Sequence, residues 1–304
     1  MKIFFLINFV FLSFIYSIFT LDRNQEDFVL KIDSGNTFSD VKNKLSQKNI
    51  FFPNLVKIVF FITNKDEDLR IGEYLFKNKD TSLEIAFKIL TNDVVYRSLY
   101  IPEGSKSLDF LTKKQIESFC EYKSISECNL DGFFHPNTYV YEFYEDFNEV
   151  LNRAFNMQLS FLENYYNKNR NSLVKNSLEL LIIASIIEKE SCRNEMPQVA
   201  GVIYNRLQKN MKLQIDSTVI YGVENFDGNL TKKHLKTSNA YNSYLNSGLP
   251  PTPISNPSLN AIKASTYPDD HKFLYFVKKE KCLHEFSTNY KDHKAAVNKF
   301  QKNK

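Results

Sequence analysis

Hydrophobic and polar positions divide the chain into three regions, and the first is an almost unbroken apolar run. Residues 3–20 contain only three polar residues before a terminal Thr, and Lys2 precedes them. A helix of about 18 residues is roughly 27 Å long, just enough for the hydrocarbon core of a bilayer. Residues 1–22 are therefore predicted to be a single-pass membrane anchor, with the rest of the chain outside the cytoplasm. No small-x-small cleavage site precedes Asp22, so a retained anchor is favoured over a cleaved signal peptide.

The second region, residues 23–92, has the spacing of a small α/β module. Apolar residues alternate with other residues from Phe28 to Ile32, which predicts a short strand. Thr37 or Ser39 caps a predicted helix, and the mostly apolar residues 50–62 predict a further packed element. A unit of this size and order is compatible with a LysM-type carbohydrate-binding module. The alternative is a plain spacer that holds the next domain off the membrane.

The third region, residues 93–304, has mainly helical spacing. Its predicted helices are residues 107–119, 143–169, 178–187 and 199–207, and its predicted strands are residues 94–101, 274–277 and 286–288. Residues 178–187 are apolar nearly all round, which predicts a buried helix. Residues 248–268 hold five of the nine prolines and are predicted to be a rigid, extended loop. The fold class is therefore predicted to be α+β with a helical core.

Charge and cysteine content narrow the possible functions. The formal net charge of +4 is spread along 304 residues, and no basic patch with interleaved aromatic residues suggests a nucleic-acid partner. An even number of four cysteines in an exported chain permits disulfides, and Cys120 and Cys128 are close enough to close a small loop. The pairing itself cannot be read from the sequence. No C-x-x-C pair is present, so no structural metal site is predicted.

The end of the predicted buried helix carries two carboxylates, Glu188 and Glu190. A carboxyl group at the end of an apolar helix has a raised pKa, because desolvation disfavours its charged form. Such a group can keep its proton near neutral pH and act as a general acid. The two residues lie about 200° apart on a helix, so they cannot form a facing pair. From this feature alone, a solvated helix end is the competing interpretation.

An ordered series of blocks around and beyond this helix resembles the endolytic murein transglycosylase family, also called YceG-like. The blocks are residues 184–191, 199–207, 213–222, 241–244, 248–257, 275–277 and 284–288, with residues 101–104 as a piece of the middle region. Three departures stand out. Thr252-Pro253-Ile254 replaces the frequent Gly-Pro-Ile or Gly-Ala-Ile. Ile215-Asp216-Ser217 replaces the frequent Thr-Asp-Pro, and Cys282-Leu283 replaces the Gly-Gly that usually precedes the histidine. The resemblance spans most of the chain.

The resemblance implies a lysozyme-like helical catalytic domain within residues 93–304, with Glu190 as the catalytic acid/base. It implies cleavage of the MurNAc–GlcNAc β-1,4 bond of nascent peptidoglycan strands to 1,6-anhydro-MurNAc ends, which terminates strand elongation. No cofactor or metal is implied. The implied partners are peptidoglycan glycan strands and peptidoglycan synthases, at the outer face of the cytoplasmic (inner) membrane. A single carboxylate is sufficient because the nucleophile, the sugar's own 6-hydroxyl, is intramolecular.

Polar and aromatic residues in the matching blocks are candidates for substrate binding, because amides, hydroxyls and tyrosine rings suit sugars. They are Gln214, Asp216, Thr218, Tyr221, Tyr241, Asn242 and His284. The competing interpretation for each is a buried polar residue that bonds neighbouring backbone. Asp216 as a second carboxylate keeps a muramidase-type hydrolase open, and a non-catalytic glycan-binding scaffold is the third possibility. The oligomeric state, the cleavage position and the protein partners are left open.

Overall fold

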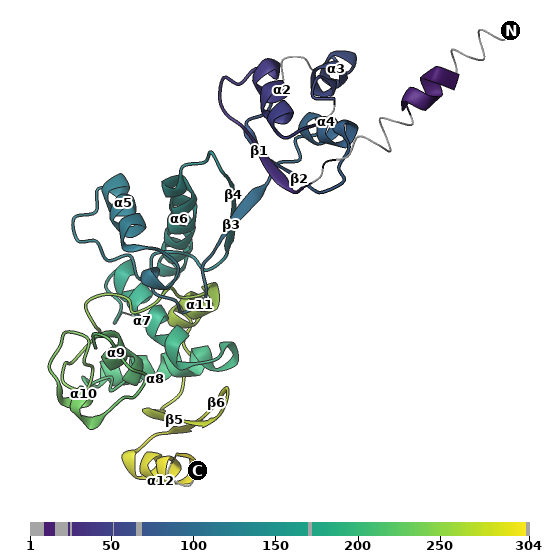
Figure 1. Ribbon diagram of the computed structural model, residues 1–304. Coiled ribbons are helices and arrows are strands. Elements are labelled where there is room, and N and C mark those ends of the chain that lie inside the picture. The colour runs from purple at the N-terminus through teal and green to yellow at the C-terminus, as the bar shows by residue number, and fades with distance from the viewer. Residues whose placement is uncertain are drawn as a thin grey trace. The chain divides into compact units, whose positions relative to one another are not determined.

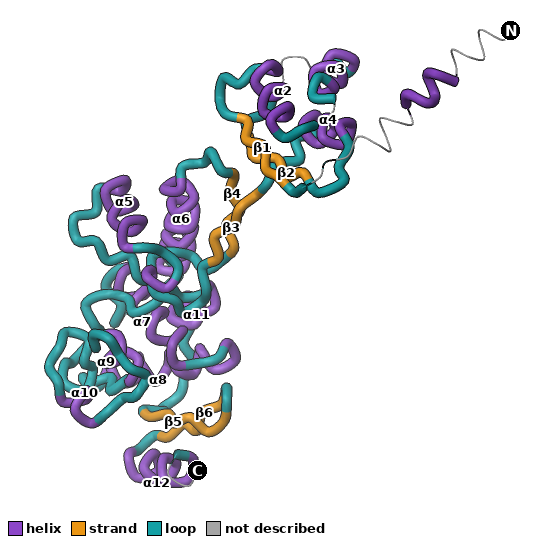
Figure 2. Tube along the Cα trace, viewed as in Figure 1, coloured by secondary structure: helices purple, strands orange, loops and turns teal. Residues whose placement is uncertain are grey.

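The computed structural model describes residues 9–15, 24, 26–50, 52–64, 69–169 and 172–301. The chain divides into two compact units, Met1–Leu99 with Val140–Asp146, and Tyr100–Tyr139 with Phe147–Lys304. Helices predominate, and the strands of the described residues form three separate two-stranded sheets (Figures 1 and 2). The predicted α+β class is confirmed.

The predicted anchor, residues 1–22, lies largely outside the described residues. Residues 9–15 of this segment are described, and they form a short helix with exposed apolar side chains. Within the described ranges, no helix combines the length and the apolar character that crossing a bilayer requires.

The first unit is built on β1 (Phe28–Ile32), which pairs antiparallel with β2 (Gly72–Phe76). Its helices are α2 (Phe38–Gln47), α3 (Leu55–Ile62) and α4 (Ser82–Leu90). The predicted strand alternation is confirmed, because Phe28, Leu30 and Ile32 are buried and the residues between them are exposed. Thr37, one of the two predicted caps, begins α2 in a capping box with Asp40. The LysM-type identity of this module stays a prediction.

The second unit surrounds one buried helix, α7 (Ser177–Glu190). Every residue of α7 from Leu180 to Ile187 is buried, as the all-round apolar pattern predicts. The helices that pack against α7 are α6 (Phe147–Tyr166), α8 (Met196–Gln208), α9 (Asp216–Tyr221) and α11 (Leu259–Thr266) (Figure 1). The remaining helices are α5 (Lys113–Lys123), α10 (Lys232–Lys236) and α12 (Tyr290–Phe300), with 3-10 turns η1 (Ser107–Asp109) and η2 (Arg193–Glu195).

Two further strand pairs complete the chain. β3 (Tyr96–Tyr100) pairs with β4 (Thr138–Glu142), and the division between the two units falls within both strands. β5 (Tyr275–Glu280) pairs antiparallel with β6 (Leu283–Ser287), so that Val277 lies opposite Glu285. This β5–β6 hairpin packs against α12.

Two sequence predictions for this unit are wrong. Residues 107–119 are not one helix, because Thr112 caps a new helix, α5, through Gln115 after the η1 turn. Residues 248–268 are not an extended loop throughout, because α11 begins after Pro257 and ends before Pro268. The prolines therefore bracket a helix, which they permit at its flanks and not in its interior.

Buried polar side chains fasten the proline-rich segment to α7 and to neighbouring loops. The Ser185 hydroxyl on α7 accepts a hydrogen bond from the N–H of Ile254 (3.0 Å). Asn256 is fully buried, and its Oδ1 accepts hydrogen bonds from the N–H groups of Gly132 and Phe134, both at 3.0 Å. These bonds fix the surroundings of α7 and so the direction in which its last turn points.

Candidate active site

The two glutamates at the end of α7 have different surroundings. Glu188 accepts hydrogen bonds at Oε2 from the Ser258 N–H (2.9 Å) and hydroxyl (2.6 Å), at the N-terminus of α11. It therefore supports α11, where a carboxylate also stabilises the positive end of the helix dipole. Glu190 instead lines a large cavity. The two side chains thus point in different directions, as expected from the angle of about 200° between their positions on a helix.

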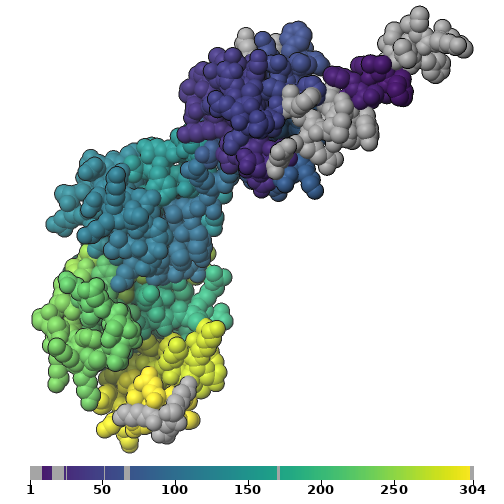
Figure 3. Space-filling view, in the orientation of Figure 1, coloured from purple at the N-terminus to yellow at the C-terminus, as the bar shows by residue number. Residues whose placement is uncertain are grey.

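The cavity has a volume of about 740 Å³, and segments that are distant in sequence form its walls. One wall comes from residues 213–216 and Tyr244, and the other from β5, His284 and α12. In Figure 3 these segments are the green and yellow surfaces, which lie side by side in the second unit. Glu190 at the end of α7 lies between them. The volume is in the range of small-molecule and oligosaccharide sites.

The surroundings of Glu190 favour a protonated carboxyl group. Burial raises its pKa above the usual value, and the nearby charge of Asp216 raises it further. The hydroxyl and N–H of Ser217 and the side chain of His284 act in the opposite direction. The Ser217 hydroxyl oxygen is itself buried and has no hydrogen-bond partner of normal geometry among the described residues. The effect of this hydroxyl on the pKa of Glu190 therefore comes from its proximity. Because the pKa of Glu190 is raised overall, this carboxyl group can serve as a general acid.

Among the described residues, Asp216 is the one other side chain with a carboxylate that lines the cavity, and it is exposed. Its Oδ1 accepts a hydrogen bond from the Tyr244 hydroxyl at 2.7 Å. Burial, followed by this bond and the Asp216 charge, raises the pKa of Tyr244. Tyr244 therefore stays a neutral donor that holds Asp216 at the rim of the site.

Arg206 on α8 lines the cavity and links its two walls. Its guanidinium is buried and donates to the carbonyl oxygens of Leu213 (2.8 Å) and Leu274 (2.6 Å). Leu213 precedes the exposed Gln214, which lines the cavity in the left-handed region at φ +49°. A non-glycine residue in this region is uncommon and costs conformational energy, so the surrounding bonds must hold it.

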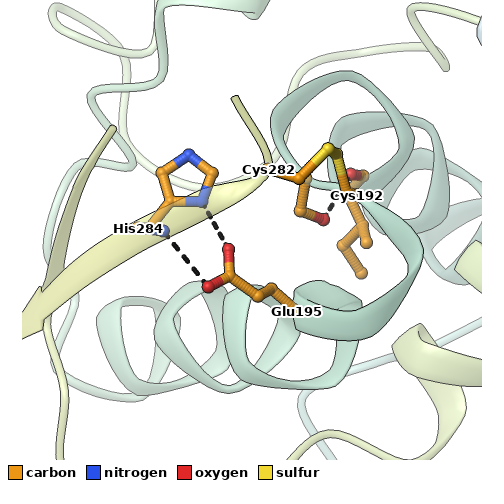
Figure 4. Close-up of a disulfide and its surroundings, with 6 residues drawn as sticks. Cys192, Glu195, Cys282 and His284 are labelled. Atoms are coloured by element: carbon orange, nitrogen blue, oxygen red, sulfur yellow. Dashed lines mark hydrogen bonds and ion pairs between the residues drawn. A yellow bond between two sulfur atoms is a disulfide. The ribbon is translucent and has the colours of Figure 1, made fainter. Parts of the chain in front are cut away.

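His284 reaches the cavity from β6 and is held by three links to the segment that follows Glu190 (Figure 4). Its Nδ1 lies 2.8 Å from Oε2 of the buried Glu195, and its backbone N–H donates to Oε1 of the same carboxylate at 3.1 Å. A disulfide between Cys192 and Cys282 adds a covalent link. The four cysteines pair as Cys192–Cys282 and Cys120–Cys128, and the second pair is the small loop that sequence spacing allows.

The other four predicted binding residues do not line this cavity. Thr218 is fully buried and bonds Ser243 Oγ and the Ile215 carbonyl, both at 2.8 Å. Tyr221 and Tyr241 pack edge to face with ring centroids 4.6 Å apart. Asn242 is fully buried, and its amide donates to three backbone carbonyls. Gln214, Asp216 and His284 are thus brought together with Glu190, and a substrate-binding role for the whole set stays a prediction.

Sequence reasoning missed Glu195, Arg206 and Tyr244. Tyr244 lies in a block that resembles the family, so that block could have suggested it, whereas nothing in the sequence pairs Glu195 with a histidine 89 residues away. The described residues contain no cluster of three or more His, Cys, Asp or Glu suited to a metal ion.

Asn242→Ala is expected to reduce stability, whereas Gln214→Ala is expected to reduce turnover. Removal of the Asn242 amide leaves buried carbonyl oxygens without donors, which should lower the free energy of unfolding by about 2–4 kcal/mol. Gln214 is exposed in the cavity, so its truncation should leave stability within about 0.5 kcal/mol and weaken turnover. Thermal or urea unfolding of both variants, with glycan-strand cleavage rates, tests the pair. A stable Asn242→Ala variant with slow turnover would instead support a substrate-binding role for Asn242.

Comparisons with known proteins identify the family to which the chain is similar. The sequence profile described as the YceG-like family matches residues 30–299. An endolytic murein transglycosylase from Bacillus subtilis is 33% identical over 176 residues, which cover 56% of this chain and 48% of the relative. One from Streptococcus pneumoniae serotype 2 is 27% identical over 312 residues, which cover 86% of this chain and 56% of the relative. The chain thus spans about half the length of these relatives.

A solved structure of a putative YceG-like protein from Listeria monocytogenes is similar over the greater part of both molecules. It aligns with a TM-score of 0.56 and 25% sequence identity, and the alignment covers 89% of this chain and 99% of that one.

Proposed function

We propose that this chain, which belongs to the YceG-like family, is a lytic transglycosylase that cleaves peptidoglycan glycan strands with Glu190 as its acid and base. The observation that supports this most is a single partly buried carboxyl between the walls of a 740 Å³ cavity. The names of its relatives agree, since both are endolytic murein transglycosylases. A reaction that needs one carboxyl group in two successive roles fits this site.

The proposed reaction has two steps. In the first, Glu190 donates its proton to the oxygen that links MurNAc to GlcNAc, and the C1–O bond breaks to leave an oxocarbenium-like centre on MurNAc. In the second, the Glu190 carboxylate takes the proton from the 6-hydroxyl of that MurNAc, whose oxygen bonds to C1. The products are a free GlcNAc 4-hydroxyl and a 1,6-anhydro-MurNAc end, and Glu190 regains its proton. Because the nucleophile is part of the substrate, its effective concentration is high and no water is consumed.

A muramidase-type hydrolase is the second candidate function, and Asp216 is the residue that would favour it. Its charge acts on Glu190, so the two carboxylates are near one another. A hydrolase would use it to direct a water molecule. The hydrogen bond that Asp216 accepts from Tyr244 and its exposed position at the rim of the cavity favour a binding role for Asp216 instead.

Mass spectrometry of the muropeptides that the purified protein releases distinguishes the two functions. The transglycosylase should give reducing-end MurNAc products that are one water lighter than those of a muramidase, throughout the digest. Asp216→Asn should keep partial activity and the same products. Products with an ordinary reducing end would establish the hydrolase, and a complete loss in Asp216→Asn would point to Asp216 as its base.

We also propose that the protein acts outside the cytoplasm, retained at the cytoplasmic membrane by residues 1–22. Two disulfides are typical of an oxidising compartment, and the apolar run of residues 3–20 is long enough to span a bilayer. A LysM-like first unit would bind the same glycan, and peptidoglycan synthases would supply the nascent strands. N-terminal sequencing of membrane-bound protein should find Met1, whereas a start near residue 21 would indicate a cleaved signal.

A further inference from the structure

We infer that Glu195 is a positioning residue that fixes the ring of His284, so that Nε2 of the imidazole is presented to the glycan beside Glu190. The inference rests on the proposed function for the identity of the substrate. The orientation of His284 by the buried Glu195 carboxylate follows from the contacts around His284 and does not depend on the substrate.

Three sides of the imidazole are occupied by protein groups. Nδ1 lies 2.8 Å from Glu195, and the rings of Phe276 and Phe286 pack against the imidazole in T-shaped geometry, with centroids 5.4 and 6.3 Å away. Nε2 points away from Glu195 in Figure 4, and no group of the described residues forms a hydrogen bond with it. His284 lines the same cavity as Glu190, and its side chain is only 10% exposed. The free nitrogen is therefore the atom through which this side chain can meet a ligand.

The two hydrogen bonds between His284 and the Glu195 carboxylate determine which nitrogen of the imidazole carries the proton. Oε1 accepts from the backbone N–H of His284, and Oε2 can only accept, so the Nδ1 proton is retained. In the neutral ring, the lone pair then lies on Nε2. This makes Nε2 an acceptor suited to a sugar hydroxyl, in the way that carboxylates behind metal-bound histidines set the tautomer of those rings.

The position of the hairpin depends on the same segment. Glu195 lies in η2, and the disulfide joins Cys192 before it to Cys282 at the turn between β5 and β6. The covalent link sets where the hairpin lies, and Glu195 sets how the imidazole on it is turned. The end of α7, η2 and the hairpin thus place Glu190 and His284 in one fixed arrangement.

Glu195→Gln tests the inference, because the amide has one acceptor and one donor. Its oxygen must accept from the backbone N–H of His284, which leaves the NH₂ group facing Nδ1 and moves the ring proton to Nε2. ¹⁵N spectra of histidine-labelled protein should show this change of tautomer, with the His284 signal assigned from His284→Asn. Turnover of peptidoglycan should fall by about 10- to 100-fold, the range known for such supporting carboxylates.

A double variant and a matched control separate positioning from stability. In His284→Asn, the further change Glu195→Gln should cause less than twofold additional loss, because its effect passes through the imidazole. Glu285→Gln removes the half-exposed Lys279–Glu285 pair of the same hairpin (3.4 Å) and should change turnover less than twofold. If Glu195→Gln does not fold, His284→Asn alone should still lower turnover by about 10-fold or more.

An unchanged tautomer, or equal losses from Glu195→Gln with and without His284, would overturn the inference. The spectra require no activity, so they decide the arrangement even if the product masses contradict a transglycosylase. Conversely, a protein that releases anhydro products but shows normal turnover in His284→Asn would keep the proposed function and lose this inference.

Discussion

Replacement of Glu190 by Gln is expected to abolish glycan-strand cleavage while the protein stays folded. The amide keeps the shape of the side chain, but it has no proton to transfer. General acid–base catalysis contributes typically about 10²–10⁴-fold, and in the proposed mechanism one residue supplies both acid and base, so the loss should reach or exceed that range. Release of muropeptides over time, measured by mass spectrometry, gives the rate. Full activity in this variant would remove Glu190 from the mechanism.

The stability of Glu190→Gln is an internal control with a defined sign. Burial raises the pKa of Glu190 above the ordinary 4.5, so the protonated form favours the folded state. That stabilisation is present below pH 4.5 and is lost as the pH rises through the raised pKa of the folded protein. Gln has no such loss, so its stability relative to the wild type should increase with pH across this window. Glu188→Gln should keep most of the activity, because its carboxyl group faces Ser258 and not the cavity.

Loss of the Cys192–Cys282 disulfide is expected to have the largest effect on stability. The bridge closes a sequence separation of 90 residues, and the chain-entropy model assigns about 4.6 kcal/mol of unfolding free energy to such a loop. The separation of 8 residues between Cys120 and Cys128 corresponds to about 2.5 kcal/mol in the same model. Urea unfolding of the two Cys-to-Ser double variants compares them directly. Cleavage should also fall in the variant that lacks Cys192–Cys282, because that bridge holds the hairpin with His284.

The Cys120–Cys128 variant is the matched control, because its cysteines lie outside the residues that line the cavity. It should lose stability and keep its rate of cleavage at a temperature where it remains folded. Equal stability losses in the two variants would mean that residual structure in the unfolded chain, and not loop length, governs both.

The buried helix was predictable because its signal is local and strong. Ten consecutive positions with hardly a polar residue leave no face for water, and the fold places every residue from Leu180 to Ile187 in the interior. The same pattern could not show α11, since α11 is a short helix with prolines on both sides. Its start depends on Ser258 and on the Glu188 carboxylate, which is 70 residues away. Contacts of this kind belong to the tertiary structure.

The candidate site was predictable only in part, for a geometric reason. Asp216 and Thr218 are two positions apart on α9, about 200° around the helix, so one of them is exposed at the cavity and the other is buried. Residue type alone makes both suitable for a sugar. Glu195 and Arg206 were missed because nothing in the sequence indicates their partners. His284 and the Leu274 carbonyl come close to them only in the folded chain.

The bridge between Cys192 and Cys282 also changes the topology of the molecule. It converts the chain between these two residues, which includes α8, α9, α10 and α11, into a covalently closed ring. A protease that cuts the backbone once inside this ring cannot separate the two fragments. The fragment with Glu190 and the fragment with His284 stay joined through sulfur, so a protein cut once gains only the mass of one water and separates into two fragments only when the bridge is reduced. In the proposed location outside the cytoplasm, where proteases and oxidising conditions occur together, the ring would keep both walls of the cavity in one covalent molecule after a single cut in the loops between them.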